Sequence, residues 1–225
     1  MSGRWRNFGD GLTGITIMAF SLFTPFLNPR RRRWGATEDE IKRDYPGDDL
    51  VPSPKGEYMH AITINSPAVI VWQWLVQIGQ DRGGFYSYEL LENLIGCKIR
   101  TADKIIPEFQ HLEIGYSIPM HPSMGSPYRV HAVDNGRSLI LLLREDVSTG
   151  KTFDLEKKIP EKYQNMSWLF FLDERDDGTT RLISRSRNDW NDSLGNTIFY
   201  GIFGPLTLEM DRKMLKGIKE RAETV

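Results

Sequence analysis

Three arginines at alternate positions are the residues whose type and spacing most directly suggest chemistry. Arg181, Arg185 and Arg187 occupy odd-numbered positions of a segment expected to be a strand, so their side chains share one face. An inward-facing row of guanidinium groups would hold a carboxylate or phosphate group of a ligand. The alternative is a solvated outer face on which the arginines pair with Asp or Glu on adjacent strands, because unpaired buried charge is expensive. Both interpretations stay open, and Arg181 and Arg185 are kept as candidate ligand-binding residues.

A second group of chemically capable residues is aromatic and acidic. Phe85, Tyr86, Tyr88 and Glu89 follow a Gly-Gly turn at the junction of two expected helices. Tyrosine and glutamate there would bind the polar end of a ligand or act as an acid–base pair. Alternatively, the aromatic rings pack in the core and the glutamate forms a structural ion pair. The apolar side chains that complete the set of ligand-binding candidates are Trp72, Met210 and Met214.

The sequence shows no pattern typical of a metal or cofactor site. Its histidines, at positions 60, 111, 121 and 131, lack metal-ligand spacing, and each is interpreted as exposed or hydrogen-bonded. Cys97 is the only cysteine, which excludes an intramolecular disulfide and a cysteine-rich metal site. Nucleophile-elbow, phosphate-loop and dinucleotide patterns are absent. We therefore predict no metal, no cofactor and no catalytic residue set.

Composition points to one large domain with an appendage. The 225 residues are 40% hydrophobic, which suffices for a sizeable core. Basic and acidic side chains nearly cancel, at 29 against 30. A chain without a basic field has no electrostatic means of attracting nucleic acid, so nucleic acid is not an expected partner.

The N-terminus carries an uncharged stretch, residues 11–29, followed at once by the run Arg30 to Arg33. Three interpretations are open: a membrane span, a helix lying in the membrane interface, or a helix packed on the domain itself. The arginines would hold the domain on the cytoplasmic side in the first two cases. We predict a cytoplasmic protein associated with a membrane surface through residues 1–33.

The next segment, residues 34–56, is interpreted as a linker with a short helix. Thr37 and Glu40 form a capping-box pattern, and Pro46-Gly47 ends the helix. Pro52, Pro54 and Gly56 indicate extended chain. The folded domain is therefore predicted to span residues 57–225.

Periodicity and turn residues within this domain predict strands and helices in a definite order. An Asn135-Gly136 pair and an Asp176-Asp177-Gly178 turn each indicate a hairpin. The first strand is followed by two short helices, and the chain ends in an amphipathic helix beginning at Pro205. The expected strands are 58–64, 98–100, 116–120, 128–133, 139–143, 151–157, 167–173 and 180–187, and the expected helices are 66–79, 88–95 and 205–223. This order predicts an α+β fold.

Several strings make the chain similar to an uncharacterised branch of the SRPBCC, or START-like, superfamily. These are Trp34 to Thr37, Tyr45 to Asp48, Val71 to Gln80, Gly83 to Glu89, Ile106 to Gln110, Thr180 to Leu182 and Met210 to Ala222. The resemblance covers about residues 34–223. It implies a helix-grip fold: a curved antiparallel sheet of about seven strands around a long C-terminal helix, with two short helices after the first strand.

The resemblance allows several functions, since fold does not select among them. The first is binding or transport of a small hydrophobic molecule, lipid or polyketide-like, in an internal cavity. The second is a cyclase or aromatase that uses Tyr86, Tyr88, Glu89 and Arg185. The third is an interaction module like a co-chaperone domain. The separate cluster domain that a ring-hydroxylating oxygenase usually carries is excluded, because the sequence has one cysteine.

Overall fold

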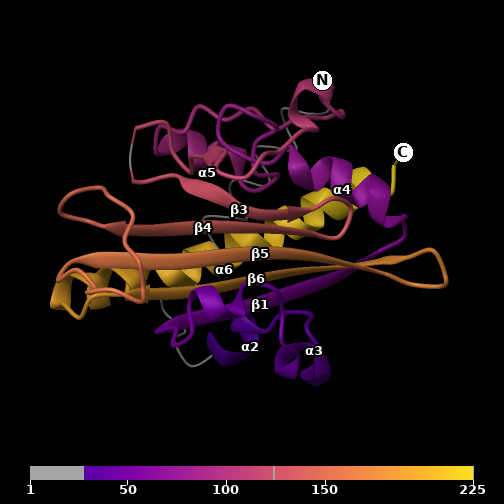
Figure 1. The fold of residues 1–225 in the computed structure, drawn as a ribbon. Helices are drawn as coiled ribbons and strands as arrows, with labels where there is room; N and C mark the ends of the chain where they lie inside the picture. Colours follow the sequence, from indigo (N-terminus) through magenta and orange to yellow (C-terminus); the bar gives the residue numbers. More distant parts are fainter. Residues whose placement is uncertain (1–27, 124, 225) are drawn as a thin grey trace.

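A computed structural model describes residues 28–123 and 125–224. In this part of the chain, an antiparallel six-stranded sheet has the order β1-β6-β5-β4-β3-β2. Its strands are β1 (Gly56–Ile64), β2 (Ser117–Ile118), β3 (Tyr128–Asp134), β4 (Ser138–Asp146), β5 (Tyr163–Glu174) and β6 (Thr180–Trp190). The helices are α2 (Asn28–Arg32), α3 (Glu38–Lys42), α4 (Ala68–Val76), α5 (Glu89–Leu94) and α6 (Leu194–Ala222), with 3₁₀ turns at Asp48–Leu50 and Pro107–Phe109. Helix α6 runs along one face of the curved sheet (Figure 1), so the expected helix-grip fold is confirmed.

Both faces of the sheet are covered, because successive side chains of a strand point in opposite directions. On β6, Leu182 belongs to the large core formed with α4 and α6. Its neighbour Ile183 belongs to a second core on the other face, with Tyr45, Met59 and Phe171. Burial of both sides explains why β6 is buried at every position from Thr180 to Ser186.

The second core exists because residues 36–52, part of the segment interpreted from the sequence as linker, pack on the face away from α6. The capping box is confirmed, since the Thr37 side chain accepts from Glu40 and the Glu40 carboxylate accepts from the Thr37 amide. Tyr45 and Val51 are buried against the sheet. Gly35 approaches β1 so closely that a Cβ would lie 2.1 Å from the Ala61 carbonyl oxygen. Only glycine fits this contact, which also needs a positive φ of 73°.

The turn signals are confirmed and two expected strands are wrong. Gly136 and Gly178 have positive φ in the two hairpins that link β3 to β4 and β5 to β6. Residues 98–100 form no strand, because the Asn93 amide already bonds the Ile99 N–H at 2.6 Å and its carbonyl at 2.9 Å. Residues 151–157 contribute one isolated bridge, between Asp146 and Lys151.

Two helix starts also differ from the prediction. Ser66 does not cap α4; the Glu174 carboxylate accepts from the Ala68 amide instead. Helix α6 begins eleven residues before Pro205, at Leu194, with the Ser193 side chain as N-cap. Pro205 lies inside this helix, where its missing N–H is tolerated although proline usually breaks a helix. Across the part of the chain that is described, no helix is both long and apolar enough to span a membrane, while residues 1–27 lie outside it.

Candidate functional site

A buried polar network lies between the sheet and α6. Asp211 on α6 accepts a hydrogen bond from the Ser184 hydroxyl at 2.7 Å, and Ser184 accepts from the Trp168 indole N–H at 2.9 Å. The other Asp211 oxygen lies 2.7 Å from His60 Nδ1. His60 and Ser184 are direct partners in the β1–β6 register, so the two strands present both groups to the same helical turn. The network therefore links three strands to the middle of α6.

The arrangement of acceptors around His60 determines the charge of this network. His60 Nε2 lies 2.7 Å from the Arg31 carbonyl oxygen, which only accepts, so Nε2 carries a hydrogen. Nδ1 and the Asp211 carboxylate oxygen lie 2.7 Å apart, and a second hydrogen must lie between them, because two bare acceptors would repel each other. The His60–Asp211 pair is then neutral overall, whichever partner holds that hydrogen. Neutrality explains how two titratable side chains that are each 1% exposed are accommodated in the core.

Tyr58 adds an aromatic wall to the network. Its ring centroid lies 5.1 Å from that of His60. Burial, together with the nearby Asp211 and Tyr128, raises the pKa of the Tyr58 phenol well above its usual value. The phenol therefore stays protonated at any physiological pH and contributes a hydrogen-bonding group without a charge.

A pocket of about 240 Å³ opens directly beside the network, between α2, the start of the packed segment, β1 and α6. Its walls are formed by Arg30, Arg31, Trp34, His60, Leu208, Glu209 and Arg212. Trp34 and Leu208 supply apolar surface, while Arg30, Arg31 and Arg212 supply cations. The Trp34 ring meets the His60 ring edge to face at 6.0 Å, so the pocket reaches down to the buried network.

Positive charge predominates around this pocket. The Arg212 guanidinium lies 4.9 Å from the Trp34 ring centroid, and its Nη1 is 3.8 Å from a carboxylate oxygen of the buried Glu209. Burial, with the neighbouring cations of Arg212 and Lys213, lowers the pKa of Lys216, whose ammonium also approaches the Trp34 ring. The ammonium of Lys216 is thus destabilised mainly by burial, and the cations of Arg212 and Lys213 add to this effect.

The buried network does not have the order of a hydrolase triad. Ser184, Asp211 and His60 are the residue types of a hydrolase triad, but here the aspartate bridges the serine and the histidine. A triad needs the histidine next to the serine, so that it can accept the hydroxyl proton. Among residues 28–123 and 125–224, no group of three or more His, Cys, Asp or Glu side chains is arranged to hold a metal ion.

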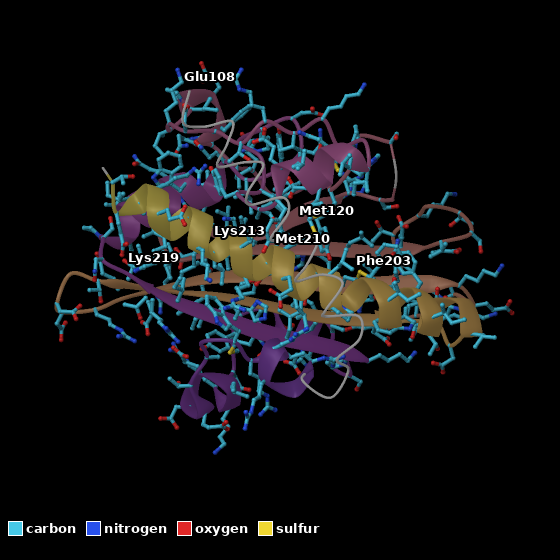
Figure 2. All side chains as sticks on the ribbon, turned by 180° about the vertical axis from the view of Figure 1, so that it is seen from behind. Glu108, Met120, Phe203, Met210, Lys213 and Lys219 are labelled. Carbon is cyan, nitrogen blue, oxygen red and sulfur yellow. The ribbon has the colours of Figure 1, made fainter. Side chains whose placement is uncertain are left out.

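The structure places the predicted aromatic candidates in packed positions. Trp72 and Met214 belong to the main core, and Met210 is partly exposed on α6 (Figure 2). The Tyr86 hydroxyl donates to the Trp74 carbonyl and accepts from the Gln77 amide. Burial raises the pKa of Tyr86 to about 12, partly offset by that Gln77 hydrogen bond.

Phe85, Tyr88 and Glu89 belong to the region around α5. Phe85 packs with Cys97 and Ile99, and Tyr88 is buried with the Lys213 ammonium 5.9 Å from its ring. The Glu89 carboxylate accepts from the Thr101 amide at 3.0 Å. None of these three lines the pocket beside His60.

The arginine row faces away from α6, as in the outer-face interpretation, but this face is not solvated, because Arg181 and Arg185 are each 8% exposed. Arg181 makes a bidentate pair with Glu40, at 2.7 and 2.8 Å. Arg185 pairs with Asp48 at 3.0 Å and with Glu57 at 2.8 Å. Most of the paired acids come from residues 34–52, not from adjacent strands as the sequence suggested. Arg185 is therefore on the opposite face of the sheet from Tyr86, and the four residues considered for cyclase chemistry do not meet in one cavity.

Sequence reasoning missed the pocket residues Trp34, Arg31 and Arg212, and the network of His60, Asp211 and Ser184. One signal was present: Asp211 lies three residues after Leu208 and four before Leu215, on the apolar face of the final helix. A charged residue on such a face needs a buried partner. Its partner His60 is 151 residues distant, and no local pattern identifies it.

Comparisons with known proteins return structures and no sequence relatives. No family model and no curated protein matches the chain. A protein from Mesorhizobium loti, MLL2253, has a TM-score of 0.40 at 13% identity over 76% of this chain and 98% of its own. The hypothetical protein jhp0584 from Helicobacter pylori reaches 0.43 at 12% identity over 80% and 95%. Truncated norcoclaurine synthase from Thalictrum flavum reaches 0.38 at 12% identity over 73% and 91%. Similarity at this level says nothing about activity or ligand.

Proposed function

We propose that this protein is an SRPBCC-like binding protein that takes a small molecule with an apolar body and an acidic group. The proposal depends on the pocket beside His60. Apolar surface from Trp34 and Leu208 lies there together with the cations of Arg30, Arg31 and Arg212. An apolar wall with a few oriented polar groups is typical of small-molecule sites. The helix-grip architecture supports the proposal, because it leaves this space between β1 and α6.

The proposed binding mode assigns a role to each part of the pocket. The apolar body of the ligand packs on Trp34 and Leu208, and its acid meets Arg212 and the α2 arginines. The neutral His60–Asp211 pair forms a rigid polar floor that does not compete for the anion. A volume of about 240 Å³ suits a ligand the size of a bicyclic aromatic acid and falls below the range of ~300–1,000 Å³ of drug-sized sites.

The test compares an acid with its neutral ester. We expect 1-naphthoic acid to bind the full chain, measured by calorimetry, and its methyl ester to bind more weakly. Arg212→Gln should weaken acid binding about tenfold, because it removes a charge-assisted hydrogen bond, and leave the ester unchanged. Arg175→Gln, in an exposed hairpin turn, is the matched control. Failure of both ligands to bind, or equal loss of acid and ester, would contradict the proposal. Native mass spectrometry of protein purified from its own cells would then show whether any small molecule copurifies.

A further inference from the structure

The N-terminal half of α6 carries an exposed apolar stripe. We define it as Leu194, Ile198, Phe199, Ile202 and Phe203, whose residues are 47–78% exposed. No charged residue occurs from Ser193 to Leu208. A contiguous apolar patch of this kind on a helix marks an interaction surface, and the stripe is separate from the ligand pocket.

The stripe points away from the sheet because other side chains of the same helix hold α6 in place. Tyr200 stacks on Trp190 of β6 with ring centroids 3.9 Å apart. The Asn196 amide donates to the Asn191 carbonyl at 2.9 Å. Figure 2, seen from behind, shows Phe203 on the α6 side of the molecule. This half of α6 is thus docked on one side and apolar on the other.

The chain enters the described structure beside α6, the helix that carries the stripe. Helix α2 contacts both β1 and α6, and Arg30 and Arg31 share the pocket wall with Leu208 and Arg212. Phe203 lies five residues before Leu208, about 7.5 Å along the helix axis. The uncharged residues 11–27 immediately precede α2. Even if helical, these 17 residues would be ~25 Å long, which is enough to reach from Asn28 across the stripe, ~14 Å from Leu194 to Phe203.

We propose that residues 11–27 cover the apolar stripe of α6 in the same chain. Two uncharged apolar stretches that face each other both leave water, which stabilises their contact. The tether through α2 gives the segment an effective concentration of millimolar order, which favours it over a second copy. This assignment selects the third interpretation of the N-terminal segment, a part of the chain packed on its own domain.

Cysteine cross-linking of the full chain tests the proposal. In a Cys97→Ser background, Phe203→Cys is combined with one cysteine at Leu12, Ile17, Phe20 or Phe23. We expect at least one pair to cross-link at monomer mass. Glu108→Cys, exposed and remote from Phe203 in Figure 2, is the matched control and should give no cross-link. A water-soluble maleimide should label Phe203→Cys at least about tenfold more slowly than Glu108→Cys, because a covered site reacts only after local opening.

Three other outcomes overturn the proposal. Cross-links found only between chains would make the stripe a self-association surface. Rapid labelling of Phe203→Cys that slows when phosphatidylcholine–phosphatidylglycerol vesicles are added would make it a membrane surface. Rapid labelling under both conditions, with no cross-link, would leave the stripe uncovered. Circular dichroism of each variant confirms that the fold is retained.

Discussion

The two faces of the sheet handle polar groups in opposite ways. Towards α6, β6 presents Ser184 to a neutral network in which a histidine and an aspartate share a hydrogen. On the face away from α6, the same strand presents the charged side chains of Arg181 and Arg185. These form ion pairs with the carboxylates of Glu40, Asp48 and Glu57. The interior face is sealed by a helix and tolerates polarity without net charge. The outer face is covered by a short segment near solvent and tolerates ion pairs.

Removing the interior aspartate should have the largest effect. Asp211→Ala leaves His60 Nδ1 and the Ser184 hydroxyl without their partner in a buried site. We expect the free energy of unfolding to fall by about 3–5 kcal/mol, the cost typical of breaking a buried pair. Urea denaturation measures it. The double variant Asp211→Leu/His60→Leu should recover part of the loss, and a loss below about 1 kcal/mol in the single variant would show that the network contributes little.

In the part of the chain that the structure describes, Glu92 is a buried carboxylate without a hydrogen-bond partner, unlike the paired groups on the two faces of the sheet. Glu92 is 2% exposed, and neither of its oxygens is hydrogen-bonded within the described residues. Burial, with a smaller contribution from Glu89, raises the pKa of Glu92 to about 7. Its folded pKa exceeds its unfolded pKa, so the stability of the protonated form is present in acid and is lost as pH rises from about 4.5 to 7.

Glu92→Gln should therefore stabilise the protein at pH 8 by a few kcal/mol, from ~1.4 kcal/mol per pKa unit, and have little effect at pH 4. Thermal melts at both pH values measure the difference. Glu108→Gln, at an exposed position outside α5, is the control. An equal effect of Glu92→Gln at the two pH values would contradict the assigned pKa.

The outer face should show a smaller effect with the opposite pH dependence. Burial tends to raise the pKa of Glu40, but hydrogen bonds from Arg181 and Thr37 outweigh it and lower the pKa overall. Its contribution is thus present above the unfolded pKa and is lost as pH falls through the folded pKa. We expect Glu40→Gln to cost about 1–2 kcal/mol at pH 7, with the loss shrinking in acid.

Limited proteolysis shows which part of the chain is destabilised in Glu40→Gln. Residues 34–52 should be cleaved faster in Glu40→Gln than in the wild type, because the pair with Arg181 fastens α3 to the sheet. Glu38→Gln, exposed on the same helix, should behave like the wild type. Equal cleavage of Glu40→Gln and wild type would show that apolar packing alone holds this segment.

The sequence alone predicted the elements whose signals are local. The Asn135-Gly136 turn, the Thr37–Glu40 capping box and the apolar face of the final helix each depend on residues within a few positions of one another. These interactions favour a backbone conformation without any distant contact, so the order of elements and the α+β fold can be predicted from them. The sequence predicts a start at Pro205 because proline favours the first turn of a helix, whereas α6 begins at Leu194 and contains that proline.

Only the tertiary structure decided which face of β6 packs against α6. Period two places Arg181 and Arg185 together, but Leu182 and Ile183 are both apolar, so either face satisfies the pattern. The choice depends on acids between 128 and 141 residues away. Glu57 lies on β1, and Glu40 and Asp48 lie in the segment interpreted from the sequence as linker. His60 and Asp211 meet for the same reason: strand pairing and helix packing bring distant residues together, and no local periodicity encodes that distance.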